Sequence, residues 1–180
     1  MTTTILWDVD GTLLLNAYSG GGELYHSAVE RAVERELGPA LPRTHGKPDG
    51  LILREILTHF GYGDECVKLE GAGLTAEALG DAAFDWQRSY FGATARDRSE
   101  ITGAARAALP DDTLVIIGDT PRDDEAAGAA GIPFIAVATG AFTVEELRQT
   151  EAILVVPDLV AGLDDVLAAI AALPAARSGA

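Results

Sequence analysis

The stretch Ile5-Leu6-Trp7-Asp8-Val9-Asp10-Gly11-Thr12-Leu13-Leu14-Leu15 decides how the fold of this chain is interpreted. Its first residues are apolar, which predicts a buried strand that runs into two carboxylates. Side chains alternate along a strand, so Asp8 and Asp10 leave on the same face, with Cα atoms roughly 7 Å apart. Two like charges at the end of an apolar strand repel each other and need a cation or a proton to compensate them. Gly11 permits a tight turn beside the pair, and Thr12 offers a hydroxyl at the same point.

Two simpler interpretations of this stretch are a solvated strand end before a turn and the beginning of a calcium-binding loop. The calcium loop requires a third ligand before its glycine and an acidic residue at its end, and the residues from Asn16 onward supply neither. We favour a functional role for Asp8 and Asp10 over both of these interpretations, because the second half of the chain supplies a matching acidic motif.

Composition narrows the function classes. The chain has 180 residues, of which 48% are hydrophobic and 23% charged, as in a globular protein of one domain with room for an insertion. A formal charge of −15 argues against binding nucleic acid or an anionic membrane, since both require clustered Lys and Arg. An anionic substrate would need a local cation, and a bound divalent metal would supply one.

Cys66 is the only cysteine, so an internal disulfide is impossible and a reducing compartment is the simplest location. Residues 1–4 lack the basic region of a signal peptide, and no apolar segment has the length of a membrane span. We therefore expect a cytoplasmic protein.

The secondary-structure pattern predicts an α/β fold. Helices are expected at 23–37, 51–60 and 99–109, and a weak strand signal covers 84–91. In the last third, strands expected at 113–117, 134–138 and 153–156 alternate with helices expected at 123–130, 145–150 and 160–173. This alternation predicts a parallel sheet with helices on both faces.

The second motif is Gly118-Asp119-Thr120-Pro121-Arg122-Asp123. Part of it is explained by a helix start alone: Thr120 is a good N-cap, Pro121 suits the first helical position, and Asp123 suits the positive end of the helix dipole. Capping explains Asp123 about as well as a functional role does. It does not explain Asp119, a carboxylate directly after an apolar strand and a glycine.

In a parallel sheet, ligands bind beyond the carboxyl ends of the strands, where Asp8, Asp10 and Asp119 would converge. Three or four carboxylates at one point describe an oxygen site suited to Mg²⁺, which keeps waters and substrate phosphate as its other ligands. Backbone N–H groups after Asp10 could hold the phosphate.

The two motifs, in this order and after strands, resemble those of the haloacid dehalogenase superfamily of phosphohydrolases. Residues 84–138, the segment 141–147, and 16–49 with His45-Gly46-Lys47 further resemble phosphoglycolate-phosphatase-like members. The resemblance implies a Rossmann-like core of residues 1–15 and 67–180, and a reduced helical cap of residues 16–66.

The resemblance also implies residue roles. Asp8 would attack phosphorus to form an aspartyl-phosphate, and Asp10 would act as general acid and then general base. Since dehalogenases of the superfamily lack the second aspartate, Asp10 favours phosphoester chemistry. Magnesium would be held by Asp8, the main-chain carbonyl of Asp10 and Asp119, with Asp123 nearby or bound through water. Substrate contacts would come from Gly11, Thr12 and Lys47, and Arg98 would neutralise charge at the nucleophile. A solvated arginine before a helix and an exposed loop lysine are the simpler readings of the last two.

The chain departs from the family in one place. Between residues 16 and 112 no apolar strand ends in the Ser or Thr that usually binds the phosphoryl group. Part of the cap and the second core strand are therefore expected to be missing, and the enzyme is expected to be slow. Either segment 84–91 pairs with the exposed edge of the strand that carries Asp8, or another chain or loop covers that edge; the aromatic residues of 84–91 favour the first.

These observations favour a magnesium-dependent phosphatase that acts on a small phosphorylated metabolite. The alternative is a degenerate member that binds a phosphate ligand or a protein partner with little or no turnover. A phosphomutase is a third possibility, but it needs a full cap to exclude water.

Overall fold

The computed structural model describes residues 2–9, 11–13, 30, 35–38, 55–61, 90, 95 and 97–175. The chain divides into two compact units, Met1–Asn16 with Thr102–Ala180, and Ala17–Ile101. The first unit contains the sheet and the residues of the acidic motifs that the structure describes. The division into a core of 1–15 with 67–180 and a cap of 16–66 stays a prediction.

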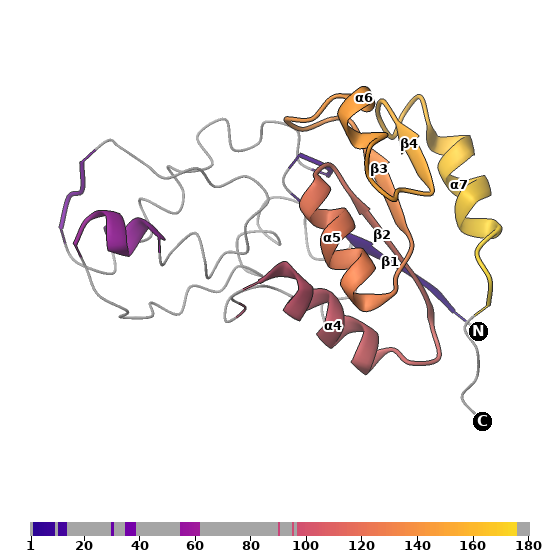
Figure 1. Ribbon diagram of the computed structural model, residues 1–180, viewed down its shortest axis with the longest axis horizontal. Helices are drawn as coiled ribbons and strands as arrows, with labels where there is room; N and C mark the ends of the chain where they lie inside the picture. The colour runs from indigo at the N-terminus through magenta and orange to yellow at the C-terminus, as the bar shows by residue number, and fades with distance from the viewer. Residues whose placement is uncertain are drawn as a thin grey trace. The chain divides into compact units, whose positions relative to one another are not determined.

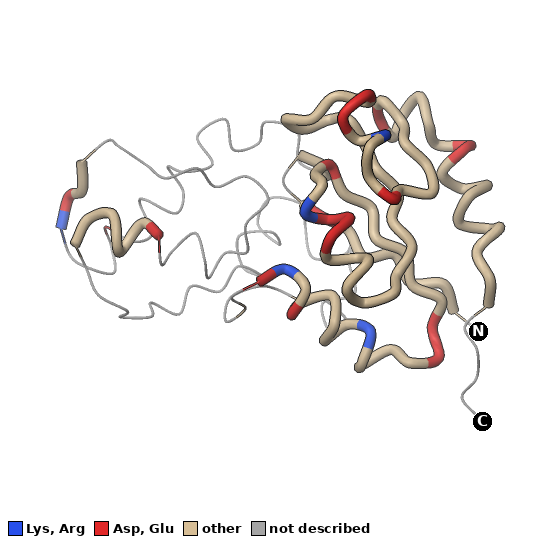
Figure 2. Tube along the Cα trace, viewed as in Figure 1, with Lys and Arg blue, Asp and Glu red and all other residues tan. Residues whose placement is uncertain are grey.

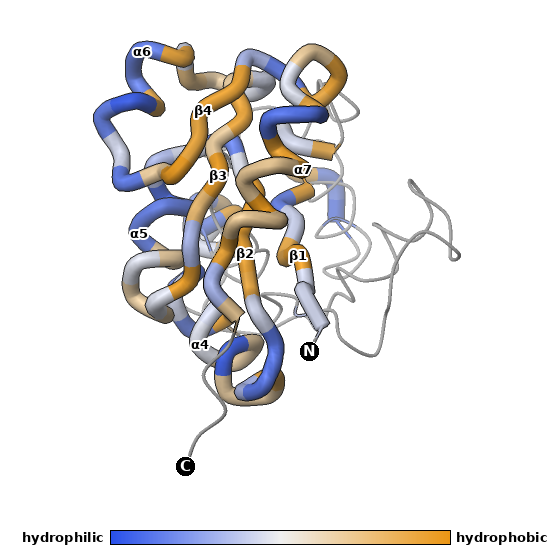
Figure 3. The backbone as a smooth tube through the Cα atoms, turned by 90° about the vertical axis from the view of Figure 1, so that its right-hand side faces the viewer, coloured by the Kyte–Doolittle hydropathy of each residue, from blue (hydrophilic) through white to orange (hydrophobic). Residues whose placement is uncertain are grey.

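The described sheet has four parallel strands in the order β1-β2-β3-β4 (Figure 1). They are β1 (Thr3–Trp7), β2 (Thr113–Gly118), β3 (Phe134–Val137) and β4 (Leu154–Val156). Apolar residues predominate along the strands (Figure 3), as expected for a parallel sheet covered on both faces. The predicted parallel α/β fold is confirmed.

The helices alternate with the strands, as predicted. They are α4 (Arg98–Ala108), α5 (Pro121–Ala130), α6 (Val144–Leu147) and α7 (Leu163–Ala171). In Figure 1, α4 and α5 lie on one side of the sheet and α7 lies on the other. The expected start of α7 at residue 160 is wrong, because Asp158 accepts a hydrogen bond from the Ala161 N–H (2.6 Å) in a turn that delays the helix until after Gly162.

The core lies on both faces of the sheet. On one face, Ile5 and Trp7 pack against a buried cluster that includes Val166 of α7. The strand members of that cluster are Val115, Ile117, Ile135, Val137 and Val156. Side-chain alternation assigns the buried Leu114, Ile116 and Phe134 to the opposite face, where α5 contacts β2 and β3. The Thr102 hydroxyl donates to the Ala126 carbonyl (2.7 Å) and so joins α4 to α5.

In the second unit, residues 55–59 are helical, in agreement with the helix expected at 51–60. The expected end of the 23–37 helix is wrong: Glu30 is helical but residues 35–37 are not. The Leu37 N–H donates to Glu30 Oε1 (2.8 Å). A side-chain oxygen thus takes the place of the backbone carbonyl four residues earlier that would accept this bond in a helix. The strand expected at 84–91 lies outside the described residues except for Tyr90, which is in no strand. None of the helices in the described ranges has the length and apolar character needed to cross a bilayer.

Candidate metal centre

Strand pairing brings Asp8 and Asp119 to the same edge of the sheet. Trp7 lies opposite Ile117 in the parallel register, and the Asp8 N–H extends the ladder by donating to the Ile117 carbonyl (2.8 Å). Asp119 follows Gly118, the last residue of β2. Both carboxylates thus stand just beyond the carboxyl ends of neighbouring strands, as the sequence predicts.

Asp123 reaches this edge from the first turn of α5. Thr120 is the N-cap, and its N–H and hydroxyl both donate to Asp123 Oδ2, at 3.0 and 2.7 Å. The Asp123 N–H donates in return to the Thr120 hydroxyl oxygen (3.4 Å), which completes a capping box. Gly118 allows the close approach, because a Cβ at that position would lie 2.5 Å from Asp123 Cγ.

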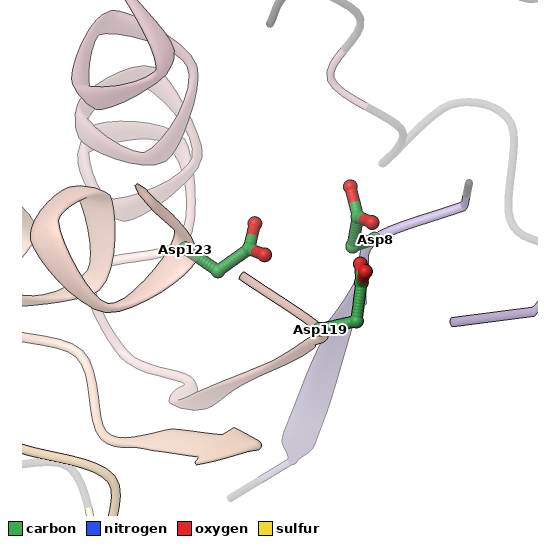
Figure 4. A group of neighbouring side chains, drawn as sticks. All are labelled: Asp8, Asp119 and Asp123. Carbon is green, nitrogen blue, oxygen red and sulfur yellow. The ribbon is translucent and has the colours of Figure 1, made fainter. Parts of the chain in front are cut away.

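Asp8, Asp119 and Asp123 form an acidic cluster at this edge. Each offers a carboxylate oxygen, and these oxygens lie within 4.8 Å of one another. In Figure 4 the side chains of Asp8 and Asp119 lie side by side and that of Asp123 points toward them. Asp119 and Asp123 are only 3% and 2% exposed, and Asp8 is half-buried. Acidic positions gather where β2 passes into α5 (Figure 2).

The acidic cluster fits a divalent metal. Carboxylates this close repel one another, and burial weakens the solvent screening that would reduce the repulsion. Hydrogen bonds from Thr12 and Thr120 offset part of this cost. A set made only of carboxylate oxygens suits Mg²⁺ and related hard cations.

The turn after β1 has the conformation that the sequence predicts. Gly11 has a φ of +90°, in the region that favours glycine, and the Leu13 N–H closes the turn on the Val9 carbonyl (3.0 Å). Thr12 is buried, and its hydroxyl donates to Asp119 Oδ1 at 3.4 Å. This contact makes Thr12 a support for the acidic cluster, while the predicted roles of Gly11 and Thr12 in substrate binding stay predictions.

Three other predicted site residues lie outside the described residues or outside the first compact unit. Asp10 and Lys47 lie outside the described residues. Arg98 is the first residue of α4, is half-buried, and belongs to the second compact unit. Its role at the nucleophile stays a prediction.

The structure adds two residues that the sequence reasoning missed, Thr139 and Gly140. The Thr139 hydroxyl donates to the Gly11 carbonyl, and a Cβ on Gly140 would overlap the Asp119 carboxylate. A signal was present in the sequence: both residues follow the strand expected at 134–138, which ends at the same edge as Asp8 and Asp119.

Comparison with known proteins agrees with this architecture. Residues 95–169 match the HAD-hydrolase-like family. A conserved haloacid dehalogenase-like protein of unknown function from Agrobacterium tumefaciens is 16% identical, with a TM-score of 0.54, covering 95% of this chain and 100% of that one. A hydrolase from Pseudomonas syringae is 16% identical over 92% of this chain and 99% of its own, with a TM-score of 0.45. A search of curated proteins finds no match.

The family match covers α4 through most of α7, and β1 completes the sheet by pairing with β2. Residues 95–169 are therefore similar to the HAD-hydrolase-like family, and the fold of the chain is similar to that of a haloacid dehalogenase-like protein.

Proposed function

We propose that the protein is a magnesium-dependent phosphatase that hydrolyses a small phosphorylated metabolite through an aspartyl-phosphate on Asp8. The observation that carries this proposal is the acidic cluster: three carboxylate oxygens within 4.8 Å at the edge where parallel α/β sheets bind ligands. Phosphoryl transfer needs mainly positioning and neutralisation of charge, and both can be provided at such a site.

Asp8 is the proposed nucleophile because it is the member of the acidic cluster that is half-buried rather than buried. One of its oxygens donates an electron pair to phosphorus, and the bond between phosphorus and the ester oxygen breaks. Asp10, in its protonated form, gives its proton to that leaving oxygen. As a carboxylate, it then takes a proton from water, whose oxygen attacks phosphorus and releases phosphate and Asp8.

Asp119 and Asp123 are the proposed metal ligands together with Asp8. Their burial and their hydrogen bonds from Thr12 and Thr120 hold both side chains in place, so little reorganisation is needed when a ligand arrives. The metal, when bound, supplies positive charge that offsets the cluster and the phosphoryl oxygens. Neutralisation is essential in a chain with a formal charge of −15, since an anionic substrate is otherwise repelled.

The deciding experiment measures phosphate release from a panel of phosphomonoesters with magnesium and with a chelator. We expect magnesium-dependent release, slower than about 10 per second because the usual phosphate-binding hydroxyl is expected to be missing. Asp8→Asn is nearly isosteric and should keep the fold but lower the rate about a thousandfold or more. Activity close to wild type in Asp8→Asn would rule out the covalent step. Binding of a phosphate ligand without hydrolysis would instead support the alternative, a degenerate family member with little or no turnover.

A further inference from the structure

We infer that Thr139 and Gly140, in the loop between β3 and α6, are positioning residues that hold Asp119 and the Gly11 turn in the geometry needed to bind the metal. The inference rests on the proposed function, because it assigns the acidic cluster the task of binding a divalent cation. Neither residue offers a carboxylate, so both would act through residues of the cluster and the turn.

Gly140 sets the space that the Asp119 carboxylate occupies. A Cβ on Gly140 would overlap Asp119 Oδ2 and lie 2.7 Å from its Cγ. A Cβ on Gly11 would lie 2.5 Å from the same Oδ2. Glycines of two separate loops thus approach one oxygen of a carboxylate that is 3% exposed. A methyl group on Gly140 would displace Asp119, and its neighbours leave little room for a new position.

Thr139 ties the same two loops together. Its hydroxyl donates to the carbonyl of Gly11, 128 positions away in the sequence. The next residue along, Thr12, donates through its own hydroxyl to Asp119 Oδ1 (3.4 Å). The loops after β1, β2 and β3 therefore form a closed set of contacts: Thr139 with Gly11, Thr12 with Asp119, and Asp119 with Gly140.

This arrangement predicts that substitutions at Thr139 or Gly140 change the affinity for metal. Residues that orient metal ligands change affinity about 10- to 100-fold when they are substituted. A purely structural role would instead change the melting temperature of the metal-free protein and leave the dissociation constant for metal unaltered.

The test is a titration of the metal-free protein with Mn²⁺, which binds oxygen ligands and can be followed by electron paramagnetic resonance. We expect Gly140→Ala to raise the Mn²⁺ dissociation constant about tenfold or more. The matched control is Gly128→Ala in α5, where a Cβ meets nothing within 4 Å and the position is exposed. It should bind Mn²⁺ as wild type does and melt at the same or a higher temperature.

A second pair of variants applies if Gly140→Ala fails to fold. Thr139→Val keeps the shape but removes the donor to Gly11, and it should raise the dissociation constant, whereas Thr139→Ser should restore the wild-type value. Wild-type Mn²⁺ affinity in a folded Gly140→Ala protein, or in a Thr139→Val protein, would overturn this inference and leave the proposed function standing. Wild-type protein that binds no Mn²⁺ would overturn the proposed function, and this inference with it.

Discussion

Two helix starts in this molecule use the same chemistry in different surroundings. Thr120 and Asp123 form the capping box of α5, and Thr143 and Glu146 form that of α6. The N–H of each threonine donates to the acid three residues on, at 3.0 Å in the first box and 2.8 Å in the second. Locally the two are equivalent: a threonine, a turn of helix and a carboxylate that accepts the same two hydrogen bonds.

Their surroundings differ. Glu146 is exposed. A hydrogen bond from the Thr143 N–H, and to a smaller extent one from the Thr143 hydroxyl, hold the pKa of Glu146 below its ordinary value of 4.5. Asp123 is 2% exposed and lies in the acidic cluster with Asp8 and Asp119. Glu146 therefore has a role that capping explains fully. Asp123 combines capping with a position in the acidic cluster, where its charge raises the energy of the metal-free protein. The comparison teaches that a capping motif becomes a candidate metal ligand through its location.

The largest effect that separates the two boxes should be on metal affinity. Asp123→Asn and Glu146→Gln each remove one charge and keep an oxygen that can accept the capping bonds. We expect Asp123→Asn to weaken Mg²⁺ binding about tenfold or more, because it removes a proposed ligand. Glu146→Gln should leave binding unaltered. Isothermal titration of both proteins checks this, and equal affinities would show that Asp123 is only a cap.

Thermal stability should separate the boxes by a smaller amount. Magnesium at a hundredfold excess over its dissociation constant stabilises the folded protein by about 2.7 kcal/mol. For a chain of this size that corresponds to a rise in melting temperature of roughly 5–10 °C relative to protein in chelator.

The rise should shrink in Asp123→Asn, whose metal-free form carries less repulsion, and should persist in Glu146→Gln. Differential scanning calorimetry with and without magnesium measures each shift. An unchanged wild-type midpoint at millimolar magnesium would count against the metal site.

The smallest effect concerns the capping hydroxyls. Thr120 is 5% exposed, so Thr120→Ala leaves part of a buried carboxylate without its donor and should lower the free energy of unfolding by about 2 kcal/mol. Thr143→Ala, at an exposed box, should cost about 0.5–1 kcal/mol. Urea unfolding in chelator measures both, and Thr120→Ser should recover most of the loss. Equal costs would mean that burial adds nothing to the capping box of α5.

Several features followed from the residues alone because they depend on local rules. Apolar runs predict strands, and the alternation of these strands with helices predicts the parallel sheet that is observed. The placement of Asp8 and Asp119 at one edge follows from the direction of parallel strands, and the N-cap at Thr120 follows from the Thr-Pro pair. Boundaries were less predictable: the Asp158 turn delays α7, and a side-chain bond from Glu30 changes the end of its helix.

The sequence by itself determined the parallel α/β architecture, the edge at which the acidic motifs meet and the N-cap at Thr120. All of these depend on side-chain periodicity or on hydrogen bonds between residues a few positions apart. Only the tertiary structure decided that the loop with Thr139 and Gly140 reaches Gly11 and Asp119. These contacts depend on the register of β1, β2 and β3. Register brings together residues far apart in the chain, and no local propensity encodes it.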